Sequence, residues 1–367
     1  MKFIIGGRVI ELNQLGDQID RAFIALHAAY FGGGALDWQE FENASIQFFD
    51  LNPKSSTSHD AYFNNFTIIW KSFLAPRNYD EAEQIWRLAL SPVLKWEASN
   101  QGRRAHKGTA YYLWGMTSLE RGDLDRGYTL MHQAVEEDVL TQQQQIPDSP
   151  AFALASLNYA KADQAYRQWV LLQANFLSSL QNKYSATYSR IFSLDEFKNR
   201  FLVKPPSIDI VFLLAYSVAR LMRLSQLPQH SIRSRFSGQL ELNILFDITL
   251  IIDAAVKTKN STKRYFIDHA KFLLLKASQP LSIKQLRQIN SDFGNNFDAT
   301  IKDLLDGVYS RPTVPTLNKF QSDVALAYGL RNHGAHDVSS SPVVWQRFLD
   351  IQQAVFNVMF GAVDYLY

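Results

Sequence analysis

The sequence predicts an all-α protein with more than one domain. Apolar residues three or four positions apart, the spacing of an amphipathic helix, recur through most of the chain. Apolar residues make up 47% and charged residues 20% of the sequence, which is typical of globular rather than disordered proteins. With 367 residues, the chain is long enough for two or three domains with sizeable cores.

The composition also indicates where the protein works. There is no cysteine, which excludes disulfides and thiolate metal sites and fits a reducing compartment. The first residues carry no signal-peptide pattern. The most apolar runs are too interrupted to cross a membrane, as in 208–224, which contains Arg220 and Arg223. We therefore expect a cytoplasmic protein without a membrane-spanning segment.

The N-terminal fifty residues predict a short strand and two helices. The glycine run at 32–34 lacks the Lys-Ser/Thr pair of a phosphate loop and follows a helical pattern, so we interpret it as a helix stop. A turn at Gly6-Gly7 separates the strand from the first helix. The predicted elements are a strand at 2–5 and helices at 16–30 and 36–49.

Residues 62–138 resemble the tetratricopeptide pattern, in which small residues let paired helices approach and aromatic residues fill the gap. The second copy matches better, but the repeat-ending proline is missing and a polar, basic loop at 100–107 lengthens the spacing. We therefore expect a small array of helical hairpins that contacts a protein or supports the C-terminal region. Plain core packing of the aromatic residues is the alternative. The two copies are Phe66, Trp70, Phe73, Ala82, Trp86 and Ala89, and then Tyr111, Trp114, Gly115, Gly122, Gly127, Met131 and Ala134.

The middle of the chain contains the predicted domain boundary. Ser149-Pro150 begins a helix that we expect to run to about Gln181, with serine as the N-cap and proline at the first helical position. The strongest break in the second half is Lys204-Pro205-Pro206. The predicted domains are 1–203, a tetratricopeptide-like region, and 204–367, a helical bundle.

The C-terminal region predicts helices throughout. The segment 238–257 is apolar nearly all round, so we expect it to be the central buried helix. The last helix, which begins at Ser341-Pro342, carries an apolar stripe that predicts either a bundle seam or a dimer face. Further helices are predicted at 208–224, 263–278, 281–293 and 298–309.

The stretch 325–338 carries the most informative polar residues. Phe320, Val324 and Ala327 form one apolar helix face, and Arg331 continues on that face. An arginine in such a position needs a partner or lines a cleft or interface. Its guanidinium can bind a phosphate, and the imidazole of His336 can transfer a proton near neutral pH. This pair suits metal-free cleavage of RNA, in which the ribose 2′-hydroxyl is the nucleophile.

The segment Arg331-Asn332-x-x-x-His336 resembles the R-polar-x(4–6)-H motif of HEPN-domain ribonucleases, over about 205–367. In that family the motif lies in an all-helical bundle, and two copies meet in a dimer to form a metal-independent site. The resemblance implies that Arg331 stabilises the pentacoordinate phosphorane, Asn332 positions the site and His336 acts as general acid/base. Other Arg–His pairs at this spacing lack a polar residue after the arginine: Arg21/His27, Arg126/His132, Arg223/His230 and Arg264/His269.

Family members often carry an acidic residue beside the motif arginine, and Asp247 is our candidate. Asp247 lies on the apolar row of the segment 238–257, where a carboxylate needs a cationic partner. We predict that Asp247 pairs with Arg331, with Asp253 and Asp323 as alternatives.

A basic helix is predicted beside the motif. Lys263, Arg264 and Lys271 alternate with aromatic residues, a combination that suits phosphate contacts and base stacking in RNA. Residues 210–287 hold twelve Lys and Arg against four acidic residues. The alternative is an ordinary surface helix whose aromatic residues face the core.

The motif residues and this resemblance predict an endoribonuclease that cleaves single-stranded RNA. The resemblance further implies that the protein works as a homodimer, in phage defence, a toxin–antitoxin system or stress RNA processing. We expect no cofactor and no metal, because His333 and His336 lack further ligands at suitable spacing and no nucleotide-binding fingerprint occurs. The alternative is a catalytically silent adaptor that binds a protein or nucleotide. That alternative would apply if Arg331 were sealed against Asp247.

Overall fold

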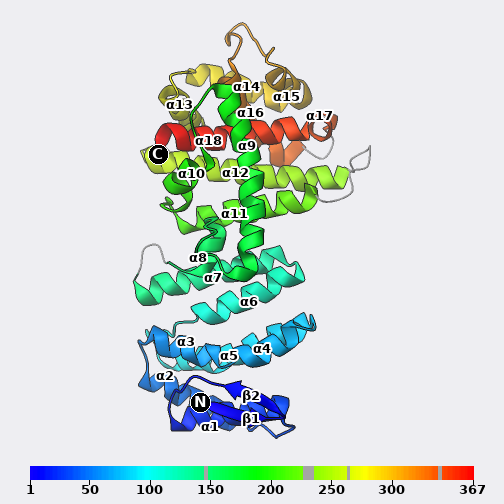
Figure 1. The fold of residues 1–367 in the computed structure, drawn as a ribbon. Coiled ribbons are helices and arrows are strands. Elements are labelled where there is room, and N and C mark those ends of the chain that lie inside the picture. Colours follow the sequence, from blue (N-terminus) through cyan, green and yellow to red (C-terminus); the bar gives the residue numbers. More distant parts are fainter. Residues whose placement is uncertain (144–147, 226–234, 263–264, 338–340) are drawn as a thin grey trace. The chain divides into compact units, whose positions relative to one another are not determined.

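The structure, a computed structural model, consists of two compact units, Met1–Phe152 and Ala153–Tyr367. Apart from one β-hairpin and a single isolated bridge, the regular elements of the described residues are helices (Figure 1), which confirms the predicted mostly helical class. Among these helices none combines the length and apolar character needed to cross a bilayer. The described residues are 1–143, 148–225, 235–262, 265–337 and 341–367.

The first unit begins with the hairpin. Strands β1 (Lys2–Ile5) and β2 (Arg8–Glu11) pair antiparallel, and Gly6 and Gly7 form the turn with positive φ angles of 55° and 75°. The strand predicted at 2–5 is therefore present. The helices that follow are α1 (Asp17–Phe31), α2 (Trp38–Leu51), α3 (Ser56–Asn64), α4 (Thr67–Leu74), α5 (Tyr79–Ser99), α6 (Gly108–Arg121) and α7 (Leu124–Gln142).

Aromatic residues fill the core of this unit. The Phe23 ring meets Phe41, Tyr62 and Phe66 edge-on, with centroid distances of 5.4, 5.3 and 5.2 Å. Such pairs add stabilisation beyond the burial of their surface. These contacts join α1 to α2, α3 and the residue that precedes α4.

Glycines set the spacing between α6 and α7. A Cβ atom at Gly127 would lie 2.4 Å from Leu119 Cδ2, and one at Gly115 would lie 3.2 Å from the Gly127 carbonyl oxygen. Only glycine permits this approach, so small residues do bring the paired helices together as predicted. Gly122 ends α6 in the left-handed conformation, with φ 92°. Close packing of one pair does not assign the unit to the tetratricopeptide class.

The helix predicted from Ser149 to Gln181 is two helices. Helix α8 (Pro150–Ala155) ends at once, because Leu157 takes a positive φ of 55° and the Asn158 N–H donates to the Ala153 carbonyl at 2.8 Å. A 3₁₀ turn, η1 (Gln164–Tyr166), precedes α9 (Arg167–Tyr188). The amide of Phe152 donates to Ser149 Oγ at 3.3 Å, so the predicted serine cap is present.

The two units divide inside α8, well before the predicted boundary at 204. The reason is that α9 packs against α18 (Phe348–Leu366). The Gln353 Nε2 donates to the Leu180 carbonyl at 3.0 Å, and the Tyr184 hydroxyl donates to Asp364 Oδ2 at 3.0 Å. Residues 153–203 therefore belong with the C-terminal helices.

Helix α18 is the central helix of the second unit. It packs against α9, α12 and α16, which lie beside it in Figure 1. Every residue from Ala354 to Val363 is buried. The segment 238–257 was predicted as the central buried helix, and α12 is indeed largely buried between α11, α16 and α18, although Asp247 and Asp253 stay partly exposed. Because the stripe of α18 is covered within one chain, its interpretation as a dimer face is wrong. The other elements are α10 (Leu194–Phe197), the π-helix η2 (Lys198–Leu202), α11 (Ile208–Ser225), α12 (Arg235–Lys259), α13 (Phe266–Lys276), α14 (Ile283–Asn295), α15 (Phe297–Leu305), α16 (Lys319–Asp337) and α17 (Pro342–Gln346).

Candidate functional site

Helix α16 carries the predicted motif into the second unit. It packs against α12, α13, α14, α15 and α18. Phe320, Val324 and Ala327 are buried, which confirms the predicted apolar face. Burial falls after Leu330, and the next three residues, 331–333, are half-buried. The motif therefore begins where the helix emerges from the core.

Arg331 has an unusual environment for a half-buried cation. Its Nε is buried without a hydrogen-bond acceptor, and no carboxylate of the described residues lies within ion-pairing distance of its guanidinium. The guanidinium carbon lies 6.0 Å from the ring centroid of Phe266, at the outer limit of a cation–π contact. The hydrogen-bond donors of Arg331 are thus not committed to an ion pair.

Asp247 does not pair with Arg331 as predicted. Its Oδ2 lies 3.3 Å from Nη1 of Arg220, so the ion pair joins α12 to α11. Burial raises the pKa of Asp247, and the charge of Arg220 lowers it again in part. The row of apolar residues located Asp247 on a buried face correctly, but that face meets α11 rather than the motif.

The two alternative acids also have other partners. Asp253 Oδ1 lies 2.5 Å from Nδ1 of His269. Asp323 is buried and accepts from Nζ of Lys319 at 2.5 Å and from Nδ2 of Asn357 at 2.7 Å. Neither carboxylate is left to hold the motif arginine.

Asn332 and His333 are held against α14. The Asn290 Oδ1 accepts from Asn332 Nδ2 at 2.8 Å and lies 3.1 Å from His333 Nε2. The His333 ring is nearly parallel to that of Phe293, at 7° and a centroid distance of 6.3 Å. Asn332 and His333 are therefore tied to α14 through Asn290.

A second arginine contributes charge at this end of α16. Burial raises the pKa of Tyr328, whereas contact with Asn332 and the positive charges of Arg287 and Arg331 lower it. Both guanidinium groups thus lie within electrostatic reach of one hydroxyl. Arg287 is exposed on α14 and forms no ion pair with the described residues. Sequence reasoning did not identify Arg287, whose only signal was its place in the basic stretch 210–287.

The structure describes only some of the remaining residues that were predicted for the site. His336 lies in α16, but its side chain is outside the described residues, as are Lys263 and Arg264 entirely. Lys271 is exposed on α13. Of the neighbouring aromatic residues, Tyr265 is 71% exposed and Phe266 is 9% exposed. Helix α13 therefore combines a core-facing ring with an outward one.

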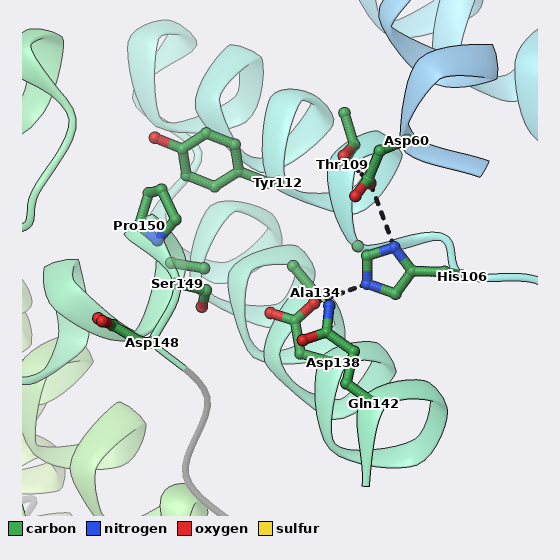
Figure 2. Close-up of a pocket in the computed structure, with 12 residues that line it drawn as sticks. Asp60, His106, Thr109, Tyr112, Ala134, Asp138, Gln142, Asp148, Ser149 and Pro150 are labelled. Atoms are coloured by element: carbon green, nitrogen blue, oxygen red, sulfur yellow. Dashed lines mark hydrogen bonds and ion pairs between the residues drawn. The ribbon is translucent and has the colours of Figure 1, made fainter. Parts of the chain in front are cut away.

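The first unit contains a pocket that sequence reasoning missed. It has a volume of about 290 Å³, and its walls come from α3, α6, α7 and the segment 148–151 (Figure 2). His106 lies in one wall between two carboxylates. Its Nδ1 is 3.1 Å from Asp60 Oδ1, and its Nε2 is 2.6 Å from Asp138 Oδ1. We call these three residues the His106 clamp.

The clamp holds a charged imidazole. Burial alone would lower the pKa of His106, but the hydrogen bonds and charges of Asp138 and Asp60 outweigh it and raise this pKa to about 9. The backbone N–H of His106 donates to His59 Nδ1 at 2.8 Å, so that nitrogen is unprotonated. His106 is therefore a cation at neutral pH and cannot serve as a general base there.

A second charge network lies beside the clamp. Lys107 is 2% exposed, and its Nζ is 2.5 Å from Glu97 Oε1 and 3.3 Å from Glu137 Oε1. Arg104 forms a bidentate pair with the same Glu137. The loop 100–107, predicted only as a polar, basic insertion, is thus tied to its unit by the side chains of Arg104, His106 and Lys107.

The described residues contain no group of three or more His, Cys, Asp or Glu side chains arranged to hold a metal ion. The pair His333 and His336 is not tested by this, because the His336 side chain lies outside them. Comparison of the chain with protein-family models, with curated proteins and with solved structures finds no match.

Proposed function

We propose that the protein is a metal-independent endoribonuclease that cleaves single-stranded RNA at a site formed by Arg331, Asn332 and His336. The observation that carries the proposal is the state of Arg331. Its guanidinium is half-buried at the end of α16, yet it pairs with no carboxylate of the described residues, and its Nε lacks an acceptor. A planar guanidinium with free donors matches the geometry of a phosphate.

Two further observations are consistent with this function, and the first of them bears on the alternative of a silent adaptor. An Arg331 sealed against Asp247 would have favoured the adaptor, but Asp247 pairs with Arg220 instead. The motif also lies in a helical unit, as the resemblance to HEPN ribonucleases requires. By the same resemblance, we propose that two copies of the chain meet as a homodimer and bring their motifs together.

The proposed reaction is an internal transesterification. The 2′-oxygen attacks the adjacent phosphorus and loses its proton, the bond to the 5′-oxygen breaks, and that oxygen gains a proton. The products carry a 2′,3′-cyclic phosphate, or after hydrolysis a 3′-phosphate, and a 5′-hydroxyl. His336 transfers the protons, Arg331 stabilises the charge on the phosphorane, and Asn332, fixed by Asn290, positions the site.

Basic side chains around the motif would hold the RNA backbone. Arg287 and Lys271 are exposed on α14 and α13, next to α16. Lys263 and Arg264 precede α13 in the sequence and lie outside the described residues, and we propose that they also bind the RNA backbone. The tetratricopeptide-like helices of the first unit would then bind a protein partner, in a defence or stress system of the kind that the resemblance implies.

An RNA-cleavage assay in EDTA tests the proposal. Purified wild type, Arg331→Ala and His336→Ala are incubated with a mixed-sequence single-stranded RNA. The wild type should cut without metal, and each variant should lose at least about 100-fold in rate, the loss typical for a charge-stabilising or proton-transferring group. Arg311→Ala is the matched control, because Arg311 is similarly half-buried but its Nε pairs with Asp292 Oδ2 at 2.7 Å. Uncut RNA with wild type, or equal cutting by Arg331→Ala, would refute the proposal.

A further inference from the structure

Two carboxylate oxygens at the pocket of the first unit accept no hydrogen bond from the described residues. In the His106 clamp, Asp60 and Asp138 both employ only Oδ1: Asp60 Oδ1 accepts from His106 and from the Thr109 hydroxyl, and Asp138 Oδ1 accepts from His106. The Oδ2 atoms of both residues have no hydrogen-bond partner among the described residues. Asp138 is only 8% exposed, so its Oδ2 is a nearly buried acceptor that the protein itself leaves unpaired.

The clamp also carries unbalanced charge. Two carboxylates surround one imidazolium, which leaves one net negative charge at the pocket wall. The nearest buried cation, Lys107, does not compensate for it, because Glu97 and Glu137 already hold its ammonium group. The Asp60 side chain is 34% exposed and thus partly solvated, but the Asp138 side chain is only 11% exposed. A nearly buried carboxylate without a full counter-charge is costly, and a cationic ligand would reduce that cost.

The rest of the pocket wall is partly polar, with Thr109, Gln142, Asp148 and Ser149, and partly apolar. Ala134, Pro150 and the ring of Tyr112 contribute to the lining. In Figure 2, Tyr112 and Pro150 lie across the pocket from His106. The two carboxylates of the clamp and this apolar part of the wall match a ligand with a cationic head and a hydrocarbon stem. A bare metal ion would find no group of three ligands here.

We propose that this pocket binds an alkylammonium group, whose N–H donors reach the Oδ2 atoms of Asp138 and Asp60 while its alkyl chain lies against Tyr112, Ala134 and Pro150. This chemistry is shared by a free aliphatic amine and by a lysine side chain. The pocket is independent of Arg331 and of the proposed nuclease function, since all of its lining belongs to the first unit.

Calorimetric titration of the full chain tests the proposal. The probes are putrescine for a free amine and Nα-acetyl-lysine methylamide for a lysine side chain, with 1,4-butanediol as the uncharged control. Saturable binding of either amine, without binding of butanediol, is expected. Tighter binding of putrescine would assign a free amine as the ligand, and tighter binding of the lysine derivative would assign a partner protein's side chain.

Variants locate the site. Asp138→Asn preserves the shape and should weaken binding at least about tenfold, as expected for loss of a charged hydrogen bond. Asp80→Asn removes a carboxylate of the same unit that is 81% exposed and should leave binding unchanged. If Asp138→Asn unfolds, Ala134→Met provides a second test, because it fills the pocket and leaves the clamp intact. Absence of amine binding to wild type, or equal binding to Ala134→Met, would overturn the proposal.

Discussion

The His106 clamp predicts that the first unit loses stability as the pH rises above neutrality. Hydrogen bonds to Asp138 and Asp60 raise the pKa of His106 from 6.5 to about 9 despite its burial. Below pH 6.5 the imidazole is protonated in both the folded and the unfolded chain, so the clamp contributes fully. Between pH 6.5 and 9 folding requires a proton that the unfolded chain has released, so this contribution declines.

The size of the effect follows from the pKa difference. Each pKa unit corresponds to about 1.4 kcal/mol, so a rise from 6.5 to about 9 gives roughly 3 kcal/mol of folding free energy. Solvent screening reduces this figure little, because the His106 side chain is 4% exposed. A contribution of about 3 kcal/mol is a large fraction of the stability of a typical domain.

Urea unfolding followed by tryptophan fluorescence measures this contribution. Five of the seven tryptophans lie in the first unit, so the signal reports mainly on it. The free energy of unfolding should be about 3 kcal/mol higher in wild type than in His106→Gln at pH 6.5, and the gap should nearly close by pH 9.5. Because other groups titrate equally in both proteins, the gap isolates His106. A gap that stays constant from pH 6.5 to 9.5 would refute the reasoning.

Predictions for three further variants concern charge and packing. Arg331→Met should leave the free energy of unfolding unchanged or raise it by up to about 1 kcal/mol, because it removes a buried donor without an acceptor, and should still abolish RNA cleavage. Arg220→Met, measured in urea in the same way, should lower the free energy of unfolding by about 1 kcal/mol or more, because half-buried Asp247 loses its partner. If Arg331→Met lowered the free energy of unfolding more than Arg220→Met does, Arg331 would be structural. Gly127→Ala should lower the melting temperature, since the new Cβ meets Leu119 at 2.4 Å, with an expected loss of about 1–3 kcal/mol. An unchanged melting temperature would show that α6 and α7 can separate without loss.

Local signals in the sequence were sufficient to predict most helices and their starts. The helix predicted at 281–293 is α14, and Ser282 caps it by forming a full capping box with Gln285. Ser341 caps α17, where its hydroxyl accepts from the Val344 amide. These features depend on residues within one turn of each other, so the sequence alone contains the necessary information.

Interactions between distant residues could not be predicted in the same way. The apolar row showed that Asp247 needs a cationic partner, but nothing in the spacing distinguishes Arg220 from Arg331. Likewise, the left-handed backbone at Leu157 interrupts a pattern that reads as continuous helix. Tertiary packing decides which helices face each other. It also decides where a segment of good helix formers breaks and turns.

The pocket in the first unit could not be predicted from the sequence for the same reason. His106 contacts residues 46 and 32 positions away in the sequence, Asp60 and Asp138. Its only local signal was a polar, basic loop between apolar helices, which is equally typical of an ordinary insertion. The three residues form a clamp only after α3, α6 and α7 have packed together.

The measurement that tests the central claim most directly compares one RNA sequence in two chemical forms. The all-ribose oligonucleotide and its 2′-O-methyl counterpart are incubated with the wild-type protein in EDTA, and the ends of the products are identified. The account predicts that only the ribose form is cut, with 2′,3′-cyclic phosphate and 5′-hydroxyl ends. Cleavage of both forms, 5′-phosphate ends or no cleavage of either form would contradict it.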